Sequence, residues 1–241
     1  MRLPRGAWGR ARAALGLAAA AVILAFGTRL AAADGPLRIL MLGDSLTAGY
    51  GLASHEALPA RVEAALRALG LDARVINAGV SGDTTSGGLA RIDWALADDP
   101  HAVVVALGAN DGLRAIDPAV TRSNLDRLLA VLSGRRLPVL LAGMLAPPNL
   151  GPDYGARFDP VYPDLAARHG ALLYPFLLEG VATVTALNQA DGLHPNAAGV
   201  EVIAERMLPA VLCLVSRADR SAPATLPDGA GSDCERWEPA P

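Results

Sequence analysis

The amino-acid sequence predicts a single α/β domain built around a parallel sheet. Between Leu37 and about Val215, short apolar runs alternate with longer amphipathic stretches, as strands and helices do in such a domain. The 241 residues suit one domain with tails, and 52% of them are hydrophobic, which is enough to build a full core. Only 4% are aromatic, so alanine, leucine and valine must make up most of that core.

The first half of the domain is predicted to hold two strands and two helices. Leu37–Leu42 is apolar enough for a buried strand, and Leu58–Leu69 has apolar residues at helical spacing. Ala73–Ala78 is the second predicted strand. Thr85–Ala97 is expected to form one helix that ends at an Asp-Asp-Pro sequence, with Trp94 in the core.

The second half begins with the clearest strand of the sequence. Ala102–Leu107 is apolar throughout, so it should lie in the middle of the sheet with both faces covered. Pro118–Leu132 is predicted to be a helix and Pro138–Met144 a fourth strand. The segment Ala146–Tyr154 is rich in proline and glycine and is expected to be a loop.

The end of the domain is predicted to hold two helices and one strand. Asp159–His169 is a helix, Leu172–Tyr174 a short fifth strand and Asn196–Val215 the last helix. Residues 216–241 are rich in proline, glycine, serine and acidic residues without periodicity, so we expect a disordered tail. The folded domain is therefore expected to span residues 34–215.

The first 33 residues are typical of an export signal. Four arginines within the first 12 residues precede an apolar run, Ala13–Phe26, and Ala31 and Ala33 fit a signal-peptidase site. The run is 14 residues long, whereas a bilayer-spanning helix needs about 20. We therefore expect cleavage before Asp34, rather than a retained membrane anchor, and a periplasmic or secreted protein.

Removal of this signal segment would leave an acidic chain without lysine. Residues 1–33 hold five of the 21 basic residues and no acidic residue, so 16 basic and 24 acidic residues remain, a net charge of −8. Such a chain is a poor candidate for nucleic-acid binding, which depends on Lys and Arg against phosphate. The absence of lysine excludes a Schiff-base lysine, a P-loop lysine and a Ser-Lys dyad.

Cys213 and Cys234 either form a disulfide or remain two free thiols.

Four polar clusters follow predicted strands or precede the last helix. Ligands of open α/β sheets bind outside the carboxyl ends of the strands, so we expect these clusters to lie close together. Each cluster alone also fits an ordinary cap or turn, but together they supply a hydroxyl, an imidazole, a carboxylate and neutral hydrogen-bond donors. The clusters are Gly43–Leu46, Asn77–Thr84, Gly108–Asp111 and Asp191–Pro195.

These groups are the ones that acyl transfer requires. A serine hydroxyl such as Ser45 needs an adjacent base, and His194 can supply it. Asp191 lies three residues before His194, so in a tight turn its carboxylate can hold the imidazole while the other ring nitrogen faces Ser45. The backbone N–H groups of Ser45 and Gly79 and the side-chain amide of Asn110 are the candidate donors to the oxyanion.

A metal site is the alternative use of some of these side chains. Asp83 and Asp111 could join Asp191 and His194 around an ion. A metal-bound His194, however, could not act as the base for Ser45, and the sequence contains no HxH or HExxH spacing. We therefore predict no metal ligands.

Together the four clusters resemble the sequence blocks of the SGNH (GDSL) hydrolase superfamily. The resemblance is strongest to its periplasmic acyl-CoA thioesterase I, lysophospholipase L1 and arylesterase group. It implies a flavodoxin-like three-layer α/β/α domain with a five-stranded parallel sheet, without metal or cofactor, and the roles given above to Ser45, Asp191, His194, Gly79 and Asn110. The matching stretches are LGDSLTAGYGL, NAGVSGDTTSGGLARIDW, LGANDGLR and DGLHPNAAG.

The expected substrate is a small-molecule acyl ester or thioester, and the expected enzyme is a monomer. Several apolar residues could line an acyl groove beside the catalytic face, although loop packing would explain them equally well. A carbohydrate O-acetyl esterase and a non-catalytic periplasmic binding domain are the alternatives. The candidate groove residues are Tyr50, Leu113, Met144, Leu145, Pro147, Pro148 and Leu150.

Overall fold

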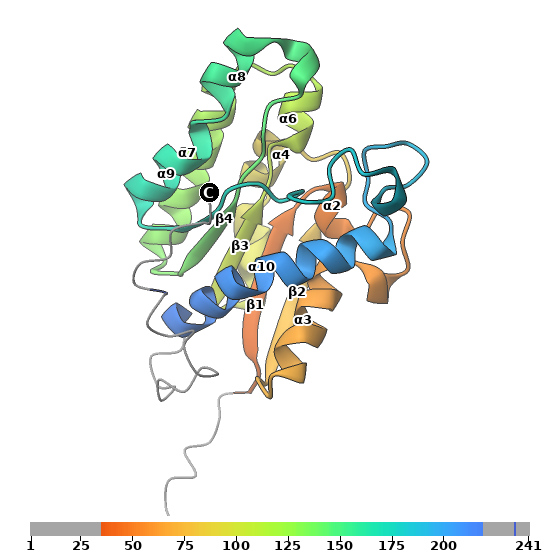
Figure 1. Ribbon diagram of the computed structural model, residues 1–241. Coiled ribbons are helices and arrows are strands. Elements are labelled where there is room, and N and C mark those ends of the chain that lie inside the picture. Colours follow the sequence, from red (N-terminus) through yellow and green to blue (C-terminus); the bar gives the residue numbers. More distant parts are fainter. Residues whose placement is uncertain (1–34, 219–233, 235–241) are drawn as a thin grey trace, which may run out of the picture. The chain divides into compact units, whose positions relative to one another are not determined.

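A computed structural model of the chain describes residues 35–218 and Cys234 (Figure 1). The predicted signal segment, residues 1–33, lies outside the described residues, as does the predicted tail apart from residues 216–218 and Cys234. None of the helices within the described part has the length and apolar character that a bilayer crossing requires.

The domain is built on one sheet of five parallel strands, as the sequence predicts. The strand order is β2-β1-β3-β4-β5, so the chain moves from β1 to one edge and then returns to the other side of β1. This reversal places a switch point between β1 and β3, where open α/β sheets bind their ligands. The strands are β1 (Leu37–Gly43), β2 (Ala73–Gly79), β3 (Ala102–Ala106), β4 (Val139–Ala142) and β5 (Leu172–Tyr174).

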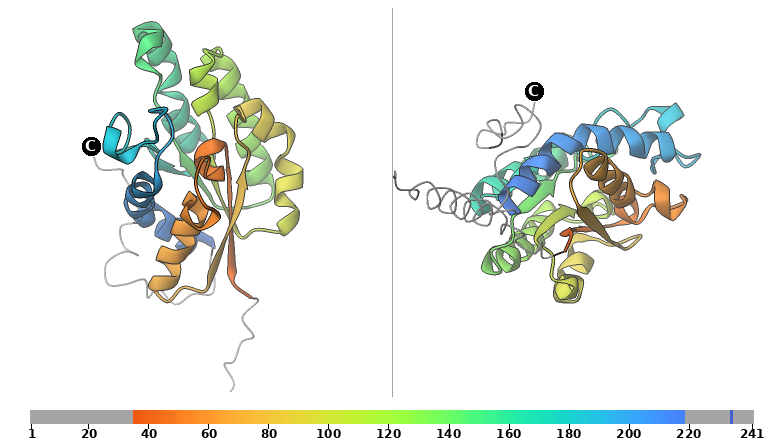
Figure 2. Two further views of the ribbon diagram at one scale, coloured as in Figure 1. Left: turned by 90° about the vertical axis from the view of Figure 1, so that its right-hand side faces the viewer. Right: turned by 90° about the horizontal axis from the view of Figure 1, so that it is seen from below.

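Helices cover both faces of the sheet and complete three layers (Figure 2). One face is covered by α3 (Leu58–Ala68) and α10 (Ala197–Ala218), which pack against each other. The other face is covered by α4 (Thr85–Ala90), α7 (Pro118–Gly134) and α9 (Val161–His169), with α7 in contact with both neighbours. The shorter helices are α2 (Ser45–Ala48), α5 (Ile92–Ala95), α6 (Ala109–Leu113), α8 (Pro152–Phe158) and the 3-10 turns η1 (Ser54–Glu56), η2 (Leu96–Asp98), η3 (Pro148–Leu150) and η4 (Thr185–Leu187).

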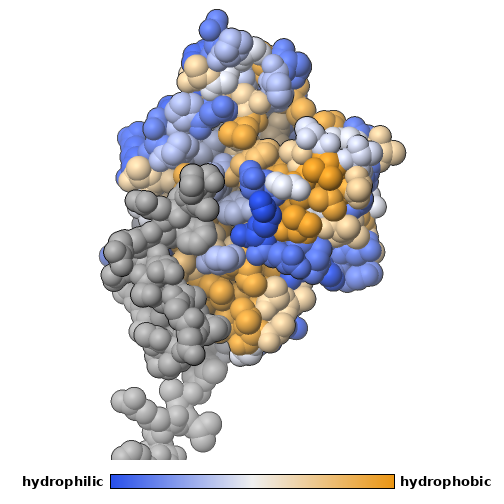
Figure 3. Space-filling view, viewed as in Figure 1, coloured by the Kyte–Doolittle hydropathy of each residue, from blue (hydrophilic) through white to orange (hydrophobic). Residues whose placement is uncertain are grey.

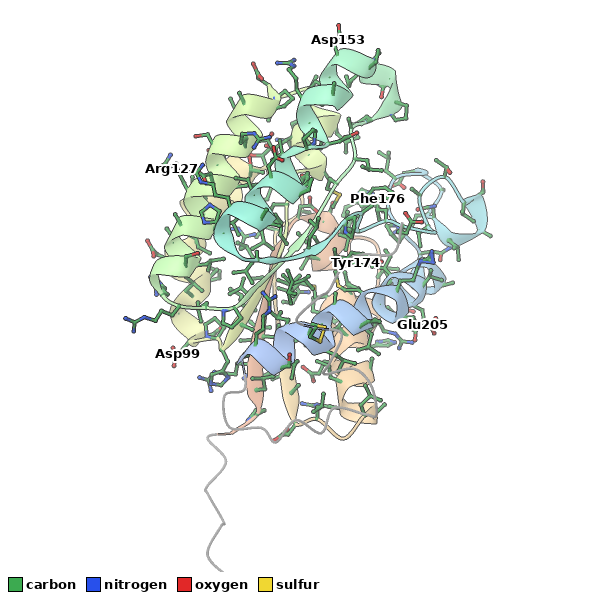
Figure 4. The ribbon with its side chains drawn as sticks, turned by 60° about the vertical axis from the view of Figure 1, so that its left-hand side comes forward. Asp99, Arg127, Asp153, Tyr174, Phe176 and Glu205 are labelled. Atoms are coloured by element: carbon green, nitrogen blue, oxygen red, sulfur yellow. A yellow bond between two sulfur atoms is a disulfide. The ribbon has the colours of Figure 1, made fainter. Side chains whose placement is uncertain are left out.

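The core lies against both faces of the central strands. Every residue of β3 is buried, which confirms the prediction of a covered central strand. Charged side chains such as Asp99, Arg127 and Asp153 lie at the outer surface (Figure 4). The expectation that Trp94 belongs to the core is wrong, because 75% of its surface is exposed. In the four-residue helix α5, Ile92 and Ala95 are buried and Trp94 faces outward.

Three predicted elements differ from the structure. The helix expected over Thr85–Ala97 is divided into α4, α5 and η2. Gly87 and Gly88 weaken a continuous helix there, because glycine loses the most backbone freedom when it becomes helical. The loop expected over Ala146–Tyr154 holds η3 and the start of α8, because its prolines occupy first helical turns, where proline is tolerated. Finally, α10 continues to Ala218.

The two cysteines form a disulfide. Cys213, on α10, is bonded to Cys234, and both residues are buried. Of the two alternatives that the sequence left open, the structure therefore shows the bonded one.

Candidate active site

The four polar clusters meet at the carboxyl edge of the sheet. Ser45 is the first residue of α2, directly after β1, and Asn110 lies in the first turn of α6, after β3. His194 and Asp191 lie on the segment between η4 and α10. The segment reaches Ser45 from the far end of the sequence, 149 residues away.

The turn from β1 into α2 fixes the Ser45 side chain. Asp44 caps the helix by accepting a hydrogen bond from the N–H of Leu46 at 3.0 Å. A Cβ atom at Gly43 would lie 2.0 Å from the Thr47 hydroxyl oxygen and 2.9 Å from the Ala106 carbonyl oxygen. Only glycine therefore allows α2 to turn this closely over the ends of β1 and β3. Ser45 itself is almost fully buried, with 9% of its surface exposed.

The serine, the imidazole and the carboxylate form a continuous hydrogen-bonded row. His194 Nε2 lies 3.0 Å from the Ser45 Oγ, and His194 Nδ1 lies 2.7 Å from an oxygen of Asp191. With Asp191 ionised, the proton must be on Nδ1, which leaves the lone pair of Nε2 for the serine hydroxyl. This is the arrangement that the three-residue spacing predicts.

The environment of Asp191 keeps its carboxylate ionised. The backbone N–H of His194 donates to it at 3.0 Å and that of Leu193 at 2.9 Å. The hydrogen bonds from the backbone and side chain of His194 are the main reasons why the pKa of Asp191 falls from 3.8 to about 2. A carboxylate with so low a pKa stays charged at any pH at which the imidazole can act as a base.

Two of the three candidate oxyanion donors are available at this edge. Ser45 begins α2, so its N–H has no partner inside the helix. The Asn110 amide donates to the carbonyl oxygen of Asp83 at 3.0 Å, which places it against the loop after β2. Because an amide nitrogen carries two hydrogens, a second donor remains on Asn110.

Gly79 lies at the same edge, at the end of β2, but its N–H is engaged. Its N–H donates to the side-chain oxygen of Asn77 at 2.9 Å, so this group is already satisfied. A Cβ atom at Gly79 would lie 2.2 Å from the backbone nitrogen of Ala48. Glycine is thus required there for the close approach of β2 and α2.

The second glycine of the same cluster lies in the turn that contacts Asn110. Within residues 35–218, the N–H groups of Val80 and Asp83 donate to carbonyl oxygens, whereas that of Gly82 has no hydrogen-bond partner. The φ angle of Gly82 is +85°, a value that favours glycine. The sequence signal for this residue was present in the Ser81-Gly82-Asp83 stretch, but the sequence alone could not separate it from Gly79.

Arg91 ties this turn to the end of β1, a role that the sequence did not reveal. Its guanidinium pairs with the Asp83 carboxylate at 2.6 Å and donates to the Gly43 carbonyl oxygen at 2.9 Å. Asp111 is likewise engaged, because it accepts hydrogen bonds from Thr85 and Thr121. The two aspartates that could have suggested a metal site thus hold α6 and the turn after β2 in place.

Asp44 is a buried carboxyl group directly behind the nucleophile. Burial raises its pKa from 3.8 to about 6, although the Leu46 N–H and the nearby Asn110 amide favour its charged form. The Asn110 amide does not complete a hydrogen bond to the second carboxyl oxygen, Oδ2, which has no partner among the described residues. The site therefore contains one carboxyl group with a lowered pKa, Asp191, and one with a raised pKa.

Apolar side chains are exposed at the carboxyl edge of the sheet. The ring of Tyr50 packs against the His194 imidazole with 4.6 Å between centroids, and Tyr50, Leu113 and Leu145 are each about half exposed. Figure 3 shows apolar surface on this face above α10, in the region of α2. Met144, which the sequence also offered for an acyl groove, is buried instead.

Residues 41–202 match the model of the GDSL-like lipase/acylhydrolase family. The chain is 42% identical over 172 residues to "Esterase TesA" of Pseudomonas aeruginosa, covering 71% of this chain and 86% of that one. It is 38% identical over 187 residues to "Thioesterase 1/protease 1/lysophospholipase L1" of Escherichia coli K12, covering 77% and 86%. Among solved structures, AlinE4, an SGNH-hydrolase family esterase, is 49% identical with a TM-score of 0.64, covering 75% of this chain and 96% of that one.

The raised pKa of Asp44 predicts a pH-dependent stability. The pKa of Asp44 is about 6 in the folded protein, above its ordinary value of 3.8. The stability that protonated Asp44 contributes is therefore full below about pH 4 and is lost as the pH rises through 6. Asp44→Asn removes this titration. Between pH 4 and 7, the free energy of unfolding of Asp44→Asn should fall by roughly 2 kcal/mol less than that of the wild type.

Urea denaturation at both pH values measures the difference. The exposed Asp98→Asn variant serves as the matched control and should follow the wild type. If Asp44→Asn has the same pH dependence as Asp98→Asn, the buried carboxyl group does not titrate as described.

Proposed function

The chain belongs to the GDSL-like lipase/acylhydrolase family and is an ester-hydrolysing enzyme, and we propose that it cleaves esters and thioesters through an acyl-enzyme on Ser45. The observation that carries the proposal is the contact of 3.0 Å between His194 Nε2 and Ser45 Oγ, backed by Asp191 on the other ring nitrogen. A nucleophile, its base and the group that orients the base are the three parts that such a mechanism needs.

In the proposed acylation step, Ser45 Oγ attacks the carbonyl carbon of the substrate while His194 Nε2 takes the hydroxyl proton. The imidazolium that forms is stabilised by the Asp191 carboxylate at 2.7 Å from Nδ1. Collapse of the tetrahedral intermediate breaks the bond to the alcohol or thiol, which leaves with the proton from His194. Water then attacks the acyl-enzyme by the same route and restores the Ser45 hydroxyl.

We assign the oxyanion to three neutral donors. The Ser45 N–H and the free hydrogen of the Asn110 amide are two of them, and we place the Gly82 N–H in the role first expected of Gly79. The hydrogen bond from Asn110 to the Asp83 carbonyl oxygen supports this choice, because it brings the turn that contains Gly82 against Asn110. Donors held in place before the reaction cost no reorganisation when charge develops on the oxygen.

The exposed apolar side chains favour substrates with an acyl chain over acetylated sugars. Tyr50, Leu113 and Leu145 expose apolar area at the carboxyl edge of the sheet, and an acyl chain would bury it. The names of the relatives, an esterase and a thioesterase/lysophospholipase, support the same substrate class. We therefore propose small-molecule acyl esters and thioesters as substrates.

We also propose that the enzyme is exported and cleaved before Asp34. The Cys213–Cys234 disulfide supports an oxidising compartment, in addition to the sequence of the first 33 residues. Mass spectrometry of protein from the native host should give a mature chain that begins at Asp34 in the periplasmic or secreted fraction. An intact Met1 terminus in the membrane fraction would identify a retained anchor.

Replacement of the nucleophile tests the proposed function directly. Ser45→Ala should abolish hydrolysis of p-nitrophenyl esters, because no acyl-enzyme can form; losses on the order of 10⁶ in turnover accompany such changes. A fluorophosphonate should add one adduct to the wild type, on the peptide that contains Ser45. Labelling of another residue, or an active Ser45→Ala variant, would overturn the assignment.

The oxyanion role predicts a specific kinetic effect of Asn110→Ala. Because its hydrogen bond strengthens only as charge develops, turnover should fall by roughly 10²–10³ while KM changes little. Asn149, an exposed asparagine, provides the control, and Asn149→Ala should stay near wild type. Equal losses in the two variants, or a large rise in KM with unchanged turnover, would remove Asn110 from the oxyanion site.

A further inference from the structure

The nucleophile and its base lie on different segments, so their distance depends on what joins the two. Ser45 is held by the sheet through β1 and α2, whereas His194 lies on an irregular segment before α10. Gln189, on the same segment as His194, connects the two sides. Its side-chain amide donates to the Tyr50 carbonyl oxygen at 2.7 Å and to the Pro195 carbonyl oxygen at 2.9 Å.

We propose that Gln189 is a positioning residue that sets the distance between His194 and Ser45. The role rests on the proposed function of these two residues. Gln189 lies outside the catalytic row itself, and its effect reaches the reaction only through the segments that it joins.

A chain of hydrogen bonds runs from the nucleophile to the base through Gln189. The N–H of Tyr50 donates to the Ser45 carbonyl oxygen at 3.1 Å, and the carbonyl oxygen of Tyr50 accepts from the Gln189 side chain. The backbone N–H of Gln189 in turn donates to the His194 carbonyl oxygen at 2.7 Å. The Tyr50 ring, packed on the imidazole, adds a second contact between the same two segments.

Space for the Gln189 side chain is provided by Gly51. A Cβ atom at Gly51 would lie 2.2 Å from the side-chain oxygen of Gln189, and the φ angle of Gly51 is +74°. Glycine at this position therefore allows the amide to reach Tyr50. A larger residue would have to push it away.

Neighbouring amides do not make this connection. Asn188 donates to the carbonyl oxygens of Val181 and Val184, within its own segment. Asn196 likewise donates to Ala186 and Asn188. These residues maintain the shape of the segment, whereas Gln189 attaches the segment to the loop after α2, and this difference supplies a matched control.

The test compares Gln189→Met with Asn188→Leu. Each variant removes an amide of the same segment that donates two hydrogen bonds and keeps a side chain of similar length. Gln189→Met should lower kcat by about ten- to hundredfold with KM nearly unchanged, because a base misplaced by about 1 Å can lose that much. Fluorophosphonate labelling of Ser45 should slow by the same factor. Asn188→Leu should lower Tm by about as much as Gln189→Met does. Its kcat should stay within about threefold of the wild type, a much smaller change than the loss expected for Gln189→Met.

A spectroscopic signal separates misplacement from general disorder. Asp191 and His194 lie on one segment, so the downfield proton resonance of His194 Nδ1 should persist in Gln189→Met while turnover falls. Loss of this resonance together with turnover would show that the whole segment had collapsed and would contradict the proposal. Equal kcat losses in Gln189→Met and Asn188→Leu, or unchanged kcat in Gln189→Met, would also overturn it.

A second pair of variants tests the contact without changing Gln189. Gly51→Ala should displace the amide and reduce kcat as Gln189→Met does. Gly70→Ala provides the control, because Gly70 also has a positive φ angle, +81°, but a Cβ atom there would touch nothing within 4 Å. Equal effects of the two alanines would overturn the proposal. An active Ser45→Ala variant would instead contradict the proposed function, so the two failures are distinguishable.

Discussion

The hydrogen bond between Ser45 and His194 is the contact on which the site depends, and it joins residues 149 positions apart. One side of it is fixed by the core. The nucleophile follows β1, whose last five residues are buried, and the register of β1 with β2 and β3 is therefore set by apolar packing. A shift by one residue would turn the buried side chains of the strand toward the opposite face. The position of Ser45 is thus a consequence of the parallel sheet.

The other side of that contact is fixed by polar groups. The segment that carries Asp191 and His194 has little regular structure, and such segments ordinarily open at low cost. Here the side-chain amides of Asn188, Gln189 and Asn196 donate to six backbone carbonyl oxygens and replace the missing ladder of a strand or helix. The nucleophile is therefore held by apolar burial. The segment that carries the base is shaped by the amides of Asn188 and Asn196, and Gln189 attaches it to the side of the nucleophile.

This division explains which features could be predicted from the sequence. Buried strands and the three-residue spacing of Asp191 and His194 are local patterns, and both the strands and the contact appear where the sequence places them. The Gln189 contact with Tyr50 joins residues 139 positions apart and has no local pattern. Gly79 and Gly82 could not be told apart for a related reason, because two glycines in one cluster look alike until the fold shows which N–H is already hydrogen-bonded.

The two carboxyl groups beside the site show how position separates chemically equal side chains. Asp191 receives three hydrogen bonds from residues 193 and 194, which hold its pKa at about 2 and keep a negative charge behind the imidazole. Asp44 is buried beneath the nucleophile, where its pKa rises to about 6. The negative charge of Asp191 stabilises the imidazolium that forms on His194. Hydrogen bonds thus favour the charged form of Asp191, whereas burial favours the neutral form of Asp44 up to about pH 6.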